Sequence, residues 1–252
     1  MERKGQVTIF IIIAIVIVVL GLLLYFFFPK IQSTLSGGAT NPQIYISECI
    51  EEEIEDVVEQ ISLHGGKVAP EFFSVYDGIE IRNLCYTEQY CTLCTIQEPQ
   101  LASSIEWEIK NEIDTEVEAC FNSLKESYER KGYEVNLKSG PVEIELLPKK
   151  ILSTFNYSLT LTKEEVETYD SFSVVLDNNL YELVAITNSI LKWERTYGRT
   201  DVTLYMDLYP TLKIEQKLLG DDTTVYILTD RNDGSKFEFA SRSLVFAPSG
   251  YC

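Results

Sequence analysis

The chain opens on an apolar run, Val7–Phe28, in which no residue is charged. As a helix, such a run would be about 33 Å long at about 1.5 Å per residue, enough to cross a hydrocarbon core of about 30 Å. Arg3 and Lys4 precede it and only Lys30 closely follows it, a bias that favours a cytoplasmic N-terminus. We therefore expect residues 1–30 to form a transmembrane helix with a short basic leader, and the remaining chain to face outward.

A stalk and an amphipathic helix are predicted next. Residues 31–41 are small and polar with paired glycines, which is typical of a flexible stalk. A helix begins with Asn41-Pro42 and is expected to end at His64, before two glycines. Its apolar stripe is Ile46, Ile50, Ile54, Val57 and Ile61. The other face carries Glu51, Glu52, Glu53, Glu55 and Asp56, which we interpret as solvated, because calcium ligands are usually spaced along a loop.

A second amphipathic helix is predicted from Ser103 to about Lys131, with Gly132 as its stop. Its apolar stripe is Ile105, Ile109, Ile113, Val117, Phe121, Leu124 and Tyr128. Residues 67–99, between the two helices, show no strong helical period and carry three cysteines, which suggests a cross-linked excursion. We expect residues 42–132 to be the helical, cysteine-containing half of an ectodomain.

Beyond Gly132 apolar and polar residues alternate, as in half-buried strands. Strands are predicted at 133–137, 142–146, 155–161, 202–206, 212–214, 225–228 and 237–239, with a helix at 178–197. Residues 133–252 are therefore expected to be a β-rich half with one helix. The predicted fold class is α+β: a transmembrane or pilin-like helix, then a disulfide-linked ectodomain with two amphipathic helices and antiparallel β-structure.

Composition narrows the classes of partner. The net charge of -18 disfavours nucleic acid, because a phosphate backbone attracts basic patches and repels acidic ones. A chain with 45% hydrophobic and 12% aromatic residues is too apolar for a disordered tail, so we expect a packed core.

Six cysteines follow the apolar run: Cys49, Cys85, Cys91, Cys94, Cys120 and Cys252. An even count in an exported domain favours disulfides. Cys49 and Cys120 fall beside the two helical stripes, which suggests that they pair, while the other four would pair among themselves. The alternative is a zinc site built on Cys85, Cys91, Cys94 and a distant fourth thiolate, for which one CxxC is weak support.

No linked set of catalytic residues is visible, and we expect neither an enzyme nor a bound cofactor or metal. The one histidine, His64, lies at a helix end, where a cation complements the helix dipole. Asn156 begins one glycosylation sequon. Four tyrosines, Tyr181, Tyr197, Tyr205 and Tyr209, could line a groove for a glycan or peptide, although ordinary packing is the simpler explanation for them.

The opening residues Lys4-Gly5-Gln6-Val7-Thr8 and the apolar run after them resemble the class III signal sequence of archaeal type IV pilin-like proteins. The resemblance implies cleavage between Gly5 and Gln6 by a membrane peptidase, and bundling of the processed helices into a filament core. That family usually has glutamate fifth in the mature chain, where this chain has Phe10.

Other segments resemble uncharacterised single-span surface proteins of small-genome archaea. They are Glu48-Cys49-Ile50, His64-Gly65-Gly66, Cys120 and Phe237–Arg242. This second resemblance implies a location in an archaeal envelope and no particular activity. Our leading hypothesis is a non-enzymatic cell-surface protein: a pilin-like filament subunit, hence a homo-oligomer, whose ectodomain adheres to another surface or makes lateral contacts. The alternative is a monomeric, membrane-anchored binding module for a glycan or peptide.

Overall fold

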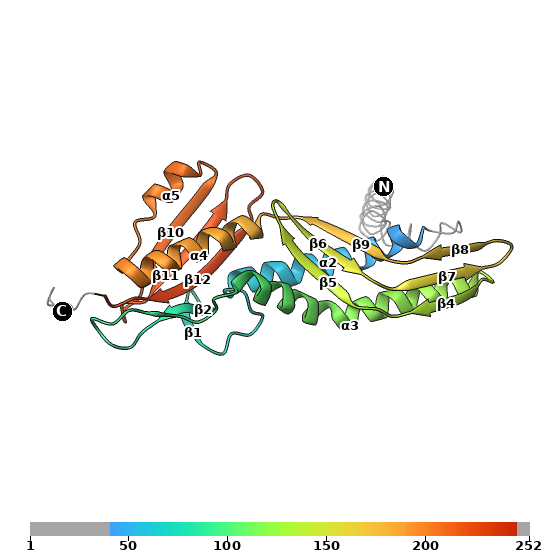
Figure 1. The fold of residues 1–252 in the computed structure, drawn as a ribbon, viewed down its shortest axis with the longest axis horizontal. Coiled ribbons are helices and arrows are strands. Elements are labelled where there is room, and N and C mark those ends of the chain that lie inside the picture. Colours follow the sequence, from blue (N-terminus) through green and yellow to red (C-terminus); the bar gives the residue numbers. More distant parts are fainter. Residues whose placement is uncertain (1–40, 246–252) are drawn as a thin grey trace, which may run out of the picture. The chain divides into compact units, whose positions relative to one another are not determined.

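The computed structural model describes residues 41–245, and chain contacts divide the protein into Met1–Asn41 and Pro42–Cys252. The second unit is built from helices and three small sheets (Figure 1). Its helices are α2 (Pro42–Leu63), α3 (Leu101–Arg130), α4 (Leu180–Tyr197) and α5 (Thr203–Leu208). The sequence predicts the first three to within about two residues at each end, because their apolar stripes are long and regular.

The expected transmembrane helix requires a correction. Among residues 41–245 no helix is both long enough and apolar enough to cross a membrane. Both α2 and α3 are long, but each is apolar on one side only and acidic on the other, as suits a helix half in water. The described fold is therefore α+β without a membrane-crossing helix. The run Val7–Phe28, on which the expectation was based, lies outside the described residues, as do residues 1–30 as a whole and most of the stalk.

The largest sheet is mixed, which corrects the expectation of antiparallel β-structure. Its strands are β1 (Phe73–Tyr76), β2 (Ile79–Tyr86), β3 (Thr95–Ile96), β10 (Leu212–Leu218), β11 (Thr224–Asp230) and β12 (Lys236–Arg242). The order is β1-β2-β12-β11-β10, with β3 also on β2. The β12–β2 pair is parallel and the other pairs are antiparallel. Local alternation reveals hairpins, whereas this parallel pair joins segments more than a hundred residues apart.

The other strands form a bent antiparallel meander. They are β4 (Glu134–Lys138), β5 (Val142–Leu147), β6 (Lys150–Phe155), β7 (Ser158–Thr162), β8 (Val166–Tyr169) and β9 (Phe172–Asp177). They pair as β4-β7-β8 and β5-β6-β9. The single strand predicted at 155–161 is wrong, because Asn156 interrupts it and its N–H donates to the Pro141 carbonyl (3.1 Å). Gly140 permits this crossing, since a Cβ there would lie 1.9 Å from the Asn156 oxygen.

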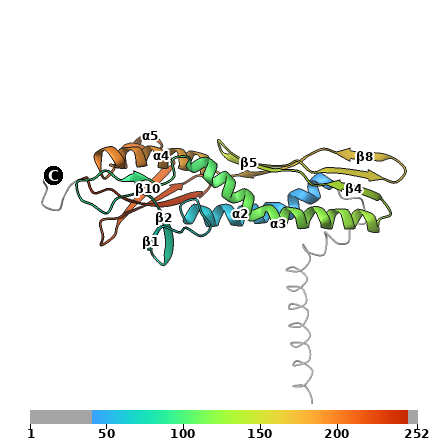
Figure 2. The same ribbon diagram turned by 60° about the horizontal axis from the view of Figure 1, so that its bottom comes forward.

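The helices α2 and α3 pack on each other, and their buried stripes form the centre of the core. α2 contacts β9 and β12, while α3 contacts β4 and β5 (Figures 1 and 2). α2 ends where Gly65 takes a φ of 73° and the Gly66 N–H donates to the Ile61 carbonyl (2.7 Å). A Cβ on Gly65 would lie 2.7 Å from the Cβ of Arg82, so the position also lacks room for a side chain.

Candidate functional site: an aromatic surface on two helices

α4 is amphipathic in an unusual way. Its inner face buries Leu180, Leu183, Val184, Thr187, Ile190, Leu191 and Glu194. It contacts β11 and β12, and Figures 1 and 2 show it lying across that sheet. The Gly198 N–H closes its last turn by donating to the Glu194 carbonyl (3.0 Å), with φ at 83°. The buried residues pack α4 onto the sheet, and the opposite face of the helix is exposed.

That outer face carries aromatic side chains where polar ones are usual. Exposed residues recur every four positions: Tyr181, Ala185, Ser189, Trp193 and Tyr197. Tyr181 is 40% exposed, Trp193 44% and Tyr197 61%. The rings of Trp193 and Tyr197 lie 4.7 Å apart, centre to centre, at 47°. The result is an exposed ridge with aromatic residues towards its ends and small residues in its middle.

α5 extends this face. Its Leu204 and Leu208 are 57% and 66% exposed, and Tyr209, directly after it, is 51% exposed. The hydroxyls of Tyr205 on α5 and Ser189 on α4 are hydrogen-bonded at 2.8 Å. The two helices therefore lie side by side, as Figures 1 and 2 show. We call the outward side chains of Tyr181, Trp193, Tyr197, Leu204, Leu208 and Tyr209 the aromatic surface.

Charged side chains of both signs border the aromatic surface, with basic residues at the end of α4 and the exposed Asp201 and Asp207 beside and on α5. Lys192, Arg195 and Arg199 are exposed on the last turns of α4 or just beyond them. None of them belongs to an ion pair among residues 41–245. Exposed α2, by contrast, carries carboxylates and no basic residue. Exposed apolar side chains with a charged rim are typical of a surface that binds another protein.

The buried Glu194 anchors α4 to the sheet below. Glu194 is 2% exposed. Its carboxylate accepts hydrogen bonds from the Tyr226 hydroxyl, the Thr200 N–H (2.7 Å) and the Ser241 hydroxyl (3.1 Å). The Ser243 hydroxyl donates to its backbone carbonyl (2.6 Å). Because every carboxylate contact is made by a fixed neighbour, we interpret this group as a support for α4. Nothing in the local sequence distinguishes it from the exposed glutamates.

Burial raises the pKa of Glu194, and its three hydrogen bonds oppose the shift only in part. The folded state therefore binds this proton more tightly than the unfolded chain does. The resulting stabilisation is complete below the unfolded pKa of about 4.3 and is lost as pH rises through the folded pKa.

Replacing Glu194→Gln keeps the shape and removes the charge, so we expect the variant to be more stable than the parent above that window. Urea midpoints measured from pH 4 to pH 8 should fall with pH in the parent and stay flatter in Glu194→Gln. The exposed Glu55→Gln provides a control for loss of one charge. If the urea midpoints of Glu194→Gln and the parent changed with pH in the same way, the ionised carboxylate would not destabilise the folded state.

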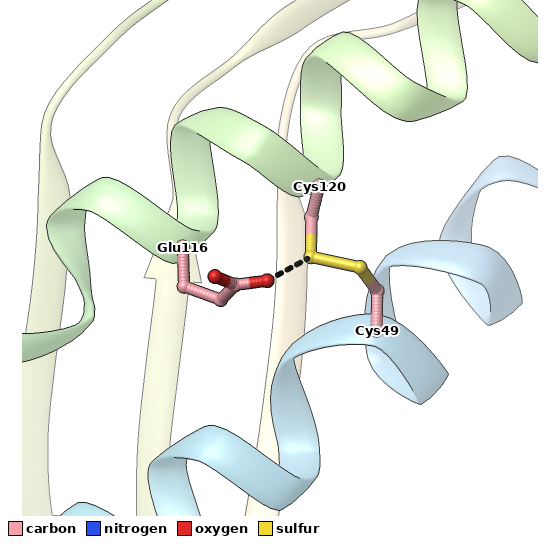
Figure 3. Close-up of side chains that lie close together, drawn as sticks. All are labelled: Cys49, Glu116 and Cys120. Atoms are coloured by element: carbon pink, nitrogen blue, oxygen red, sulfur yellow. Dashed lines mark hydrogen bonds between the residues drawn. A yellow bond between two sulfur atoms is a disulfide. The ribbon is translucent and has the colours of Figure 1, made fainter.

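Two disulfides confirm the expected disulfide bonding. Cys49 on α2 and Cys120 on α3 are joined, with Cα atoms 6.1 Å apart, and Cys85 is joined to Cys94, with Cα atoms 5.4 Å apart. Figure 3 shows the first bond with Glu116, whose Oε1 lies 3.9 Å from the Cys120 sulfur. These three groups have the spacing of metal ligands. In a disulfide, however, neither sulfur is a thiolate, and the same holds for Cys85 and Cys94 in the zinc site considered from the sequence.

Cys91 is also disulfide-bonded, and the other four described cysteines are already paired. By elimination we predict Cys252 as its partner. The Cys91 N–H donates to the Leu244 carbonyl (2.7 Å), so Cys91 lies next to a residue that is eight positions before Cys252. Mass spectrometry of unreduced tryptic peptides should recover a peptide linking Cys91 to Cys252. Recovery of Cys252 as an alkylated free thiol would contradict the pairing.

The remaining predicted positions are dispersed. Asn156 is half-buried in the break between β6 and β7. Gly5 and Gln6 lie outside the described residues. Tyr181, Tyr197, Tyr205 and Tyr209, in contrast, all lie on α4 or α5 or directly after α5, so the structure brings them together. They are on outer helix faces, and Tyr205 is the half-buried member.

A hollow of about 340 Å³ lies elsewhere, between residues 67–72, which follow α2, and the elements β2 and α3. Its lining includes Lys67, Arg82 and Glu108. Lys67 pairs with Glu108 (2.5 Å) and Arg82 pairs with Glu98 (3.2 Å). Both basic side chains are therefore already paired within the protein, and the other charged residues of the lining, Glu71 and Glu112, are acidic. We place no site there.

Comparison of the chain with protein-family models, with curated proteins and with solved structures gave no match. The functional argument therefore depends on this chain's own residues.

Proposed function

We propose that the protein is a non-enzymatic structural protein that acts outside the cytoplasm and makes lateral protein contacts through the aromatic surface. The observation that carries the proposal is the exposure of six large apolar side chains on the adjoining faces of α4 and α5. Large exposed apolar patches with polar borders are typical of interaction sites, because leaving them in water is unfavourable. Tyrosine, tryptophan and arginine are also the residues that most often dominate binding energy at interfaces.

The proposed location is supported by the disulfides. Bonds such as Cys49–Cys120 and Cys85–Cys94 persist in oxidising compartments and are rare in a reducing cytosol. The high negative charge supports solubility at a surface and disfavours nucleic acid as the partner.

The contact proposal can be tested on intact cells with an amine-reactive cross-linker. We expect the full-length parent to yield an adduct of higher mass. In the double variant Trp193→Ser with Tyr197→Ser the yield of this adduct should fall about thirtyfold, which corresponds to the loss of an interface hot spot. Trp107→Ser is the matched control, because Trp107 is 58% exposed on α3, away from the aromatic surface. Adducts of equal yield in all three proteins would refute the proposal.

A filament is the more specific form of the proposal, supported by the Gly5-Gln6 motif alone. Mass spectrometry of the native N-terminal peptide tests it, by comparing protein sheared from cells with protein retained. Sheared chains that begin at Gln6 would support processing and filament assembly. Retained chains that keep the residues before Gln6 would refute it and leave the contact proposal intact.

Glycan or peptide binding is a second candidate, favoured by the adjacent exposed rings of Trp193 and Tyr197. A glycan panel probed with the purified full chain tests it. Saturable binding that Trp193→Ser abolishes and Trp107→Ser preserves would favour this function over protein contacts. Absence of binding across the panel would remove the glycan form of this candidate.

A further inference from the structure

We propose that a hollow at the end of β2 binds an uncharged oligosaccharide. The hollow has a volume of about 540 Å³, which is within the range of about 300–1,000 Å³ typical of ligand pockets. Its lining includes Phe72, Tyr86, Glu88, Gln89, Thr92 and Gln97. None of these residues belongs to the aromatic surface, so the proposal goes beyond the contact function and does not depend on it. We call this feature the Phe72 hollow.

The apolar part of the Phe72 hollow is a pair of aromatic rings. Phe72 is 43% exposed, and its ring meets that of Tyr86 at 82°, with the centroids 4.6 Å apart. The Arg242 guanidinium lies 5.5 Å from the centroid of the Tyr86 ring and donates a hydrogen bond to the Thr87 carbonyl (3.2 Å). Arg242 therefore holds Tyr86 in place, while Phe72 keeps exposed ring surface. Sugar rings carry C–H groups on their faces, and such groups pack well on the electron-rich face of an aromatic ring.

The polar part of the lining consists of amide, carboxylate and hydroxyl groups. The side chains of Glu88 and Gln89 are exposed and have no hydrogen bond or ion pair within residues 41–245. The Gln97 amide nitrogen donates once, to the Thr95 carbonyl (2.9 Å), which leaves its second N–H and its oxygen for a ligand. A sugar hydroxyl donates one hydrogen bond and accepts two, so an amide can serve it in both ways and a carboxylate can accept from it. The Phe72 hollow therefore combines aromatic surface with uncommitted polar groups that suit hydroxyls.

The frame of the hollow is held by covalent and hydrogen bonds of the protein itself. The residues between β2 and β3 are closed into a loop by the Cys85–Cys94 disulfide. The Thr87 N–H donates to the Arg242 carbonyl (3.1 Å), which ties the start of that loop to β12. Because this backbone is already ordered, little binding free energy would be spent on ordering it around a ligand.

The charge of the lining selects an uncharged ligand. Among the described residues, Glu88 is the single charged one that lines the hollow. A carboxylate without a lining cation repels phosphates, uronic acids and other anions. An apolar peptide would leave the amide and carboxylate groups without hydrogen-bond partners, which is unfavourable. A neutral oligosaccharide matches both the rings and the polar groups.

Isothermal titration calorimetry of the purified full chain tests the proposal. The probes are neutral oligosaccharides of glucose, galactose and mannose, and the corresponding oligomers of their uronic acids. We expect saturable binding of at least one neutral probe, and binding of its acidic counterpart that is about tenfold weaker or absent. If no neutral probe binds, or if a neutral probe and its acidic counterpart bind equally, the inference is overturned.

Two variants locate the ligand in the hollow. Phe72→Ala should weaken binding about tenfold, because it removes the exposed ring, whereas Phe72→Tyr should preserve binding. Gln89→Ala should also weaken binding, and it leaves the fold intact because the Gln89 side chain has no hydrogen bond within the described residues. Val75→Ala is the matched control, because Val75 is 56% exposed on β1 and does not line the hollow. Unchanged binding by Phe72→Ala or by Gln89→Ala would overturn the inference.

The Phe72 hollow and the aromatic surface can fail separately. Trp193→Ser should leave oligosaccharide binding unchanged, and Phe72→Ala should leave the cell-surface adduct unchanged. If Trp193→Ser abolishes oligosaccharide binding and Phe72→Ala does not, the aromatic surface is the glycan site and the inference about the Phe72 hollow is refuted. If the adduct does not depend on Trp193, the contact function fails and the Phe72 hollow is unaffected.

Discussion

Replacing Cys49 and Cys120 together by serine is expected to destabilise the unit Pro42–Cys252 by about 4 kcal/mol, because the bond closes a loop of 71 residues and limits the freedom of the unfolded chain. Equilibrium urea unfolding, with parent and variant kept oxidised, measures the loss. The bond also joins α2 to α3, whose stripes form the centre of the core, so its loss should loosen the central helix pair.

The pair Cys85→Ser with Cys94→Ser provides the matched control. Its bond closes a sequence separation of only 9 residues, for which the same relation gives about 3 kcal/mol. A loss for the short loop that equals or exceeds the loss for the long one would show that loop closure is not the source of the stability.

Phe121→Ala should remove about 3–5 kcal/mol from the free energy of unfolding, the usual cost of deleting a buried aromatic side chain. Phe121 on α3 is 1% exposed. Its ring stacks on Tyr157 with centroids 4.1 Å apart and meets Phe172 edge to face at 5.0 Å. Truncation would therefore leave a cavity between α3 and the meander, where neighbouring rings cannot close it without moving the strands.

Urea unfolding monitored by circular dichroism measures this effect. Trp107→Ala is the control, because this ring is 58% exposed and contacts the Lys67 ammonium (4.8 Å), so its removal should cost about 1 kcal/mol or less. A loss for Phe121→Ala below about 1 kcal/mol would contradict the packing described for this region.

The long helices were predictable because each has many repeats of one period and a glycine stop. α2 and α3 each bury isoleucine stripes over five or more turns, and Gly66 and Gly132 follow them. Short elements offer too few repeats for that argument. β1, β3 and β8 have two to four residues, too few for an alternation to be recognised. β2, β6 and β9 contain adjacent apolar residues that interrupt the alternation, namely Leu84-Cys85, Ile151-Leu152 and Val174-Val175.

α5 shows how local alternation can mislead. Val202–Met206 alternates apolar and polar residues and was predicted as a strand, but Thr203–Leu208 is a helix. The Asp201 carboxylate accepts a hydrogen bond from the Thr203 N–H (3.0 Å), which forms an Asx turn one residue before the N-cap Val202. Pro210 follows the helix, consistent with a stop. These two residues were the signal that could have identified α5.

The aromatic surface was predicted in part. The sequence analysis indicates its tyrosines as a possible ligand site but indicates neither Trp193 nor Leu208. Leu204 falls within the strand that is wrongly predicted at 202–206. The outward four-residue spacing of Tyr181, Trp193 and Tyr197 was visible in the sequence once the inner face of α4 was fixed. Their proximity to α5 depends on tertiary packing through Ser189 and Tyr205, which no local pattern contains.

The place of β12 in the sheet has a consequence for biogenesis. β12 lies between β2 and β11, so the last described strand fills the middle of the sheet and also contacts α2, the first described helix. A chain that emerges N-terminus first must therefore wait until Arg242 is available before its core can close. Products cut short before Lys236 would leave β2 and β11 as open edges, which mark a chain for proteolysis or aggregation. Only a chain synthesised at least as far as Arg242 can close this sheet over α2, so the topology makes folding of the N-terminal helix pair depend on the last described strand.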